Sequence, residues 1–144
     1  MVDACPLPGS IPGWDETLSV KWSNVRSWCK PIIQECVEKH NLELELVAAI
    51  VMQESGGNPN AVNPSGATGL MQVMRDTVMK FRPSVSELLD PETNIRTGCN
   101  ILRGYIDNYG SIKDGLWAYG GTAGSYADYA DIVLRVYDTI AAAP

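Results

Sequence analysis

The hydrophobic and polar positions of this chain repeat with the period of an α-helix over most of its length. Apolar residues are spaced by three or four between residues 28 and 40, between residues 91 and 109, and between residues 126 and 140. Pro91 suits the first turn of the middle segment, and Gly110 marks its end. Because no segment taken over its full length makes a convincing strand, we expect an all-α fold, a compact domain of about five or six helices.

The most apolar segment, residues 42–54, carries signals of two kinds. Its first leucines alternate with polar residues, and this alternation alone would favour a strand. The apolar run then continues through Met52 with many alanines and leucines, and Gly56 and Gly57 follow as a helix stop. We therefore predict a helix that ends near Glu54.

The remaining segments have weaker patterns. Prolines and glycines crowd the start of residues 1–27, which predicts an irregular N-terminal arm before a main domain of residues 28–144. The composition of residues 58–69 predicts a loop, and residues 69–81 suggest a short, weakly amphipathic helix. Residues 111–125 predict another short helical piece, interrupted by glycines.

The size and charge of the chain exclude several classes of protein. Its 144 residues, 45% of them hydrophobic, suit one domain with a single core. The net charge of −6 and the scatter of the 11 Lys and Arg residues argue against a nucleic-acid partner. No apolar stretch approaches the roughly 20 residues of a transmembrane helix, and the N-terminus lacks the features of a signal peptide. We expect no transmembrane segment, and an export signal that is absent or already removed; the oligomeric state stays open.

The four cysteines are even in number, and with His40 as the single histidine they argue against a metal site. Cys29 and Cys36 lie two turns apart on the predicted helix, roughly 10 Å, which is too far to bridge. Disulfides would therefore join Cys5 to Cys29 and Cys36 to Cys99, or Cys5 to Cys36 and Cys29 to Cys99. Buried free thiols are the alternative.

Glu54 is the candidate for catalysis. It follows Leu46 and Ile50 at intervals of four, on the helix face that packs against the core. Burial and the negative end of the helix dipole both raise the pKa of a carboxyl at this place. A glutamic acid that stays protonated near neutral pH can protonate the leaving oxygen of a glycosidic bond. The alternative is a solvated residue at a helix end.

The residues around Glu54 carry a more specific signal. QESGGNPNAVNPSGATGLMQVM resembles the central signature of the soluble lytic transglycosylase and goose-type lysozyme superfamily, in which ES ends a helix and GA.GLMQ follows a loop. DPETNIRTGCNILRGYI resembles a third motif of that family, WAYGG its AYNAG motif, and YADIVLRVY its closing element. The resemblance runs from residue 28 to residue 138. It implies a lysozyme-like helical fold with a substrate groove.

The matching positions imply an active site. Glu54 would be the catalytic acid and base, oriented by a hydrogen bond from Ser55. Further residues would line the saccharide groove or approach the carboxyl and the sugar: Met71, Gln72, Tyr119 and Tyr129.

Some matches imply a structural role, and one position departs from the pattern. Asn94 and Gly98 would serve a helix start and a close helix contact. Where the family has asparagine after AY, this chain has Gly120. Either another residue supplies the contact of the missing amide or the groove is altered.

The resemblance implies a lytic transglycosylase that acts on peptidoglycan. Glu54 would protonate the bond between N-acetylmuramic acid and N-acetylglucosamine and then deprotonate the C6 hydroxyl, giving a 1,6-anhydro product without metal or cofactor. Asp76, Asp90 and Glu92 are the acids nearest the motifs, and none is persuasive as a second carboxylate. The alternatives are a goose-type lysozyme, which would deliver water, and an inactive wall-binding or virion structural domain.

The implied substrate lies outside the cytoplasm. We therefore expect the protein to act in the periplasm, at the cell wall or from a phage particle, where disulfides persist. Bacterial or phage origin and endo or exo cleavage are left open by the sequence.

Overall fold

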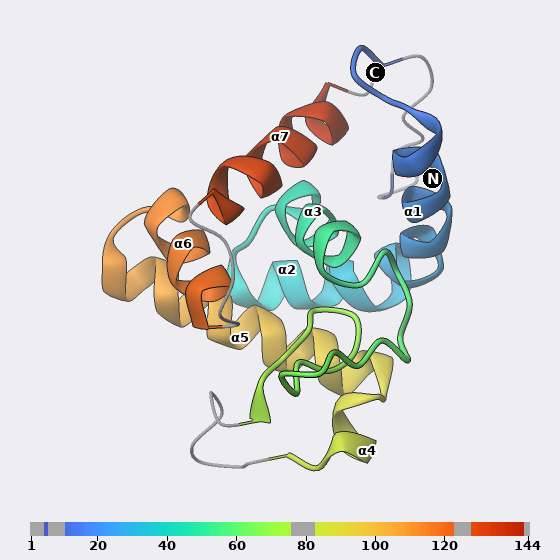
Figure 1. Cartoon of the computed structure of the whole chain (residues 1–144). Helices are drawn as coiled ribbons and strands as arrows, with labels where there is room; N and C mark the ends of the chain where they lie inside the picture. Colours follow the sequence, from blue (N-terminus) through green and yellow to red (C-terminus); the bar gives the residue numbers. More distant parts are fainter. Residues whose placement is uncertain (1–4, 6–10, 76–82, 123–127, 143–144) are drawn as a thin grey trace.

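A computed structural model of the chain describes residue 5 and residues 11–75, 83–122 and 128–142. The expected all-α fold is confirmed: within these ranges the only β-type pairs are two isolated bridges, Val62 with Thr68 and Thr68 with Val73. In chain order the helical elements are α1 (Glu16–Trp28), the π-helical turn η1 (Cys29–Ile33), α2 (Gln34–His40), α3 (Leu44–Glu54), α4 (Val85–Leu88), α5 (Pro91–Tyr109), α6 (Ile112–Thr122) and α7 (Tyr129–Ala141) (Figure 1).

Helix α3 forms the centre of the core. Every side chain from Leu46 to Met52 is buried, as expected of a helix that is apolar on all faces. The helix packs against α1, α2 and α7, and Figure 1 shows it in the middle of the molecule between them. Its end at Glu54 confirms the predicted boundary.

Helix α5 begins and ends where the sequence predicts. The Asp90 side chain caps it by accepting a hydrogen bond of 3.0 Å from the Thr93 N–H, and Pro91 occupies the first helical position. Gly110 ends the helix with a φ of 87°, in the left-handed region. Packing of α5 against α6 and α2 closes the lower side of the core (Figure 1).

The irregular arm predicted for residues 1–27 is wrong over its second half, which is helical. Helix α1 carries Trp22 and Val25 into the same core cluster as α3, so this part of the predicted arm belongs to the helical core. The apolar positions of α1 are sparse and lie among serines, which is why its period was weak. Residues 1–4 and 6–10 lie outside the described part of the chain.

Helix α1 runs on into α2 through the π-helical turn η1. Pro31 lies in this turn and has no N–H to give to a regular α-helical bond. The backbone of Gln34 donates instead to the carbonyl of Cys29, five residues earlier. The chain leaves α2 at Asn41, which takes the left-handed conformation with a φ of 52°.

The short helix predicted for residues 69–81 is wrong for residues 69–75, which form turns around the bridge of Thr68 with Val73. Gly69 has a φ of 78° and Gln72 a φ of 50°, values that no right-handed helix contains. The rest of that predicted helix lies outside the described residues.

The cysteines follow neither expected pairing completely. Cys5 and Cys29 form a disulfide, while Cys36 and Cys99 are buried free thiols. The pairing of Cys5 with Cys36 is therefore wrong. The alternative pairing is half confirmed, because it includes the bond of Cys5 to Cys29.

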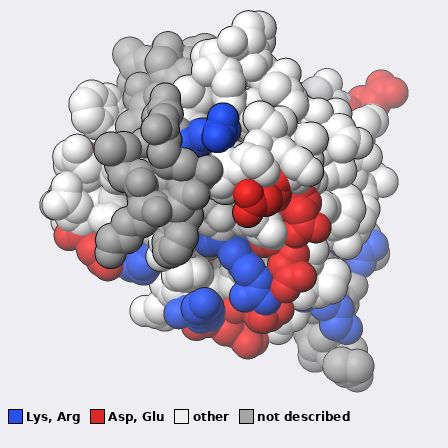
Figure 2. Space-filling model, turned by 90° about the horizontal axis from the view of Figure 1, so that it is seen from below, with Lys and Arg blue, Asp and Glu red and all other residues white. Residues whose placement is uncertain are grey.

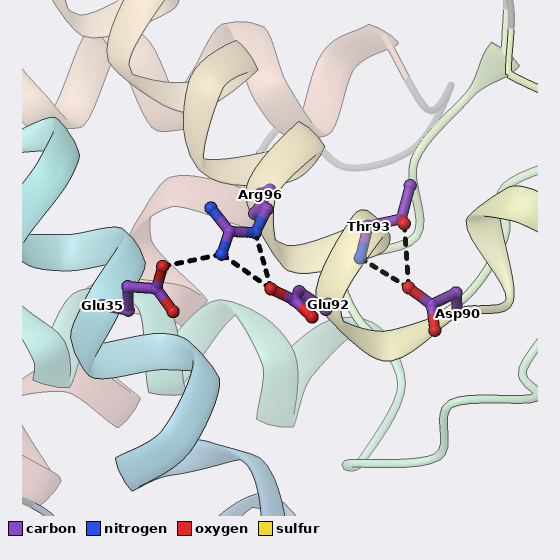
Figure 3. Close-up of polar contacts among 5 residues, drawn as sticks. All are labelled: Glu35, Asp90, Glu92, Thr93 and Arg96. Atoms are coloured by element: carbon purple, nitrogen blue, oxygen red, sulfur yellow. Dashed lines mark hydrogen bonds and ion pairs between the residues drawn. The ribbon is translucent and has the colours of Figure 1, made fainter.

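Charged side chains of both signs are mixed on the molecular surface. Figure 2 shows acidic and basic groups side by side on the face seen from below. In one cluster Arg96 of α5 contacts Glu92 at 2.6 Å and Glu35 of α2 at 2.7 Å (Figure 3), so it ties the two helices together. None of the helices in the described part of the chain is long and apolar enough to cross a membrane.

Candidate active site

Glu54 is the last residue of α3, and it is half-buried. This burial raises the pKa of Glu54 to about 7. The hydroxyl of Tyr129 donates to Oε2 of Glu54 at 3.0 Å and partly opposes that rise. The carboxyl therefore changes its charge close to neutral pH.

Two tyrosines, Tyr129 at the start of α7 and Tyr119 on α6, lie close to Glu54. Tyr129 is 1% exposed and Tyr119 is 5% exposed. Burial, and then the charge of Glu54, raise the pKa of both phenols well above the ordinary value. Both hydroxyls thus stay neutral donors at a pH where Glu54 ionises. The resemblance implied that both tyrosines approach the carboxyl or the sugar; the Tyr129 hydroxyl is bonded to the carboxyl, whereas the Tyr119 hydroxyl is bonded to the backbone of Met71.

The Tyr119 hydroxyl does not point to open solvent but donates to the backbone carbonyl of Met71 at 2.8 Å. The Met71 side chain is fully buried, and its sulfur and methylene atoms fill the space beside Gly98, where a Cβ would lie 2.5 Å from Sδ. Met71 therefore does not line a groove with its side chain. Gly98 does make a close contact, but its partner is Met71 in the turn and not a second helix as predicted.

Gln72 closes the turn that follows the glycine-rich loop. Its side-chain amide donates to the carbonyls of Ala61 and Gly69, both at 2.9 Å, and the residue is 7% exposed. These bonds stabilise the left-handed backbone of Gln72, which costs free energy for a residue with a side chain. The donor end of this amide is therefore engaged within the protein.

Asn94 organises the same turn from α5. It is fully buried; its oxygen accepts from the Met71 N–H at 2.8 Å, and its amide donates to the carbonyls of Thr68 and Leu88, each at 2.7 Å. The predicted role at a helix start is wrong, because Asp90 caps α5. A buried amide with all these bonds made fixes the turn relative to α5.

Ser55 holds the turn after Glu54 rather than the carboxyl itself. Its hydroxyl donates to the Val51 carbonyl at 3.1 Å and accepts from the Gly57 N–H at 3.1 Å. These bonds satisfy backbone groups at the end of α3. The predicted hydrogen bond from Ser55 to Glu54 is replaced by this cap.

Helix α1 supplies contacts that the sequence did not indicate. The Asn24 amide donates to the Gly56 carbonyl at 3.0 Å, and the Trp28 indole donates to the Gly57 carbonyl at 3.2 Å. A Cβ on Gly57 would lie 2.5 Å from Cβ of Asn24 and 2.8 Å from the backbone nitrogen of Val25. The only sequence signal was the GG pair itself, which marks a close approach without naming its partner.

The other candidate carboxylates serve the helix scaffold. Asp90 accepts from Thr93, and Glu92 contacts Arg96 (Figure 3). Asp76 lies outside the described residues. No group of three or more His, Cys, Asp or Glu side chains in the described ranges could hold a metal ion.

The family of this chain follows from comparison with known proteins. The family model described as "Transglycosylase SLT domain" matches residues 31–133. The chain belongs to this family. The SLT domain includes Glu54, the turn around Gln72 and both tyrosines, whereas the whole of α1 precedes the match.

Named relatives of this SLT domain come from bacteria and from a phage. It is 38% identical to membrane-bound lytic murein transglycosylase C of Serratia proteamaculans over 76% of the chain and 33% of that protein. It is 34% identical to the endo-type membrane-bound lytic murein transglycosylase A of Klebsiella pneumoniae, over 89% of the chain and 66% of the relative. A transglycosylase of Enterobacteria phage PRD1 is 42% identical over 58% of the chain and 31% of the phage protein.

The fold of the SLT domain is also found in a solved structure. The crystal structure of the 70 kDa soluble lytic transglycosylase of Escherichia coli matches with a TM-score of 0.62 and 25% identity, over 86% of this chain and 27% of that one. The chain thus spans about one third of the length of the Serratia and phage proteins, and about two thirds of the length of the Klebsiella protein.

Proposed function

We propose that this SLT domain is a peptidoglycan lytic transglycosylase in which Glu54 acts first as acid and then as base. The observation that carries the proposal is the half-buried Glu54 carboxyl with a pKa of about 7, which accepts a hydrogen bond from Tyr129. Such a group can give a proton and take one back at the same pH. The names of the relatives, lytic murein transglycosylases, support the substrate class.

The reaction uses one carboxyl twice. Glu54 gives its proton to the oxygen between N-acetylmuramic acid and N-acetylglucosamine, and the bond from that oxygen to the muramic acid C1 breaks. The acetamido group of the muramic acid stabilises the cationic carbon. The Glu54 carboxylate then takes the proton of the C6 hydroxyl, whose oxygen bonds to C1. The product is a 1,6-anhydro sugar, no water is consumed and the carboxyl returns to its first state.

The neighbours of Glu54 have supporting roles in this proposal. Tyr129 orients the carboxyl, and Tyr119 with Gln72 holds the turn that forms one wall of the saccharide site. Met71 contributes its backbone to that wall, and Ser55 fixes the chain direction after Glu54.

The partners of the acids nearest the motifs support transglycosylation over hydrolysis. Most glycosidases pair an acid with a second carboxylate that acts as nucleophile or activates water. Asp90 and Glu92, the described acids nearest the motifs, are engaged by Thr93 and Arg96 instead. A domain acting on peptidoglycan works outside the cytoplasm, and we place it in the periplasm, at the cell wall or on a phage particle.

Mass spectrometry of the muropeptides released from purified peptidoglycan tests the proposal. We expect products lighter by one water than hydrolytic products, and we expect Glu54→Gln to abolish them. Glu45→Gln, the same change at the other end of α3, is the matched control and should keep full activity.

Two outcomes would contradict the proposal. Reducing-end products from the parent protein would make it a goose-type lysozyme. No products from any protein, with retained binding to peptidoglycan, would make it a binding domain.

A further inference from the structure

Gly120 on α6 is in direct contact with the ring of Tyr129. A Cβ built at Gly120 would lie 2.3 Å from both Cγ and Cδ1 of Tyr129 and 2.8 Å from its Cβ. Real Cβ atoms essentially never approach other heavy atoms within 3.0 Å. The ring thus occupies the space of any side chain at position 120.

The backbone itself does not require a glycine at this position. Gly120 lies inside α6 and is not among the glycines with positive φ. A glycine within a helix weakens it relative to alanine. The physical reason for a glycine at position 120 is therefore the close approach of Tyr129.

The Tyr129 ring, which packs against Gly120, also carries the hydroxyl that contacts the Glu54 carboxyl. Tyr129 is 1% exposed, and its hydroxyl donates to Glu54 Oε2 at 3.0 Å. Helix α7 packs against both α6 and α3, so the ring is held between the helix of Gly120 and the helix of Glu54. Because an aromatic ring is rigid, a displacement at its Cγ also displaces its hydroxyl.

We propose that Gly120 is a positioning residue, whose missing side chain seats the Tyr129 ring against α6 so that the phenol meets Glu54. This inference rests on the proposed function, in which Glu54 is the acid and base. It also accounts for the departure from the family pattern. An asparagine at position 120 would require the ring to move, so glycine and this ring position occur together.

A purely structural role would look different, and the chain offers controls for it. Gly115, also on α6, has a similarly close neighbour, since its Cβ would lie 2.6 Å from Cγ1 of Ile106, against 2.3 Å at Gly120. Gly104 on α5 has no atom within 4 Å of such a Cβ. Gly115→Ala therefore controls for crowding of α6, and Gly104→Ala controls for the loss of a helical glycine.

The test measures the Glu54 pKa directly, together with activity. We would label glutamate carboxyls with ¹³C, identify the Glu54 signal by its loss in Glu54→Gln, and titrate Gly120→Ala, Tyr129→Phe and both controls by NMR. The pH dependence of kcat/KM for anhydro-muropeptide release and the melting temperature would be recorded for the same proteins.

We expect Gly120→Ala to raise the Glu54 pKa in the same direction as Tyr129→Phe, because both remove a hydrogen bond that lowers it. The alkaline limb of kcat/KM should move up with it, and kcat/KM should fall at least about tenfold because the carboxyl loses its orientation. The double variant Gly120→Ala with Tyr129→Phe should have the same Glu54 pKa as Tyr129→Phe alone, because both substitutions remove the same hydrogen bond. Gly115→Ala should lower the melting temperature without changing the Glu54 pKa. Gly104→Ala should change neither the melting temperature nor the Glu54 pKa.

A folded Gly120→Ala with the parent's Glu54 pKa would overturn the inference, and so would additive pKa changes in the double variant. If the parent protein releases no anhydro products but Gly120→Ala still moves the Glu54 pKa, the proposed function fails while the positioning stands. If the parent protein releases anhydro products but Gly120→Ala leaves the Glu54 pKa unchanged, the positioning role fails while the proposed function stands.

Gly120→Ala could also prevent folding, and a second variant covers that case. Tyr129→Gly removes all three Tyr129 atoms that would lie within 3.0 Å of a Cβ at position 120. In the Tyr129→Gly background, Gly120→Ala should therefore not lower the melting temperature further. If Gly120→Ala unfolds the Tyr129→Gly protein, the conflict does not involve Tyr129 and the inference is wrong.

Discussion

Glu54 couples catalysis to stability through a single proton. Its pKa of about 7 in the folded protein lies above the ordinary value of 4.5, so between these values the folded state binds the proton more tightly than the unfolded state. The contribution of Glu54 to stability is therefore complete below pH 4.5 and is lost as the pH rises through 7.

Glu54→Gln should therefore stabilise the protein in an alkaline buffer. We expect the free energy of unfolding at pH 8 to rise by up to about 3 kcal/mol, because the amide avoids burying a charge, with little change at pH 4. Urea unfolding followed by circular dichroism at both pH values measures this difference. The stability change caused by Glu45→Gln should not depend on pH in this way. An equal effect of Glu54→Gln at both pH values would refute the raised pKa of Glu54.

Asn94 is the buried amide on which the turn of Gln72 depends. In Asn94→Ala the Met71 N–H and the carbonyls of Thr68 and Leu88 would lose their partner inside the protein. We expect a loss of about 2–4 kcal/mol in the free energy of unfolding and a clear loss of lytic activity. Asn100→Ala, at an exposed position on the same helix, is the control for thermal unfolding and activity. Equal stability of the two variants would mean that the turn does not need the amide.

At the scale of helices, α1 packs on the turn that leaves the end of α3. Gly57 and Gly66 both have positive φ, 81° and 99°, so alanine strains the backbone at either position. Only at Gly57 would the new Cβ also meet α1, whereas nothing lies within 4 Å at Gly66. This pair of glycines separates backbone strain from the contact with α1.

Gly57→Ala should thus reduce both stability and kcat more than Gly66→Ala does. We expect the additional loss of kcat to be severalfold, because the carboxyl at the end of α3 shifts with the turn. Kinetics on peptidoglycan and melting temperatures of the two variants measure it. Indistinguishable kcat values would show that α1 supports the fold without helping to position Glu54.

For the whole molecule, the disulfide of Cys5 with Cys29 ties Cys5 to the end of α1. The bond spans 24 positions, and closing such a loop stabilises a protein by about 3 kcal/mol in the chain-entropy estimate. Reduction should lower the melting temperature by roughly 10 °C. Alkylation of the denatured protein without reductant should add two groups, at Cys36 and Cys99. Addition of four groups would contradict the disulfide, and addition of none would require a second one.

The sequence by itself determined the features that neighbouring residues encode. Hydrophobic period and length gave α3, and Asp90, Pro91 and Gly110 gave the limits of α5, because caps and stops act within one turn. The apolar run and the two glycines after it placed Glu54 at the end of its helix, and the family resemblance implied that Tyr129 approaches the carboxyl or the sugar. Local signals failed where they were weak, as in α1, or where backbone conformations interrupt a helical pattern, as at Gln72.

The tertiary structure alone decided which distant groups meet. The hydrogen bond from Tyr129 to Glu54 joins residues 75 positions apart in the sequence, and the bond from Asn24 to Gly56 joins residues 32 positions apart. Whether Cys29 pairs with Cys5 or with Cys99 was likewise settled by packing. A period of three or four residues states which face of a helix is buried but not what covers it. The pKa of Glu54, which depends on that cover, is therefore a property of the assembled core.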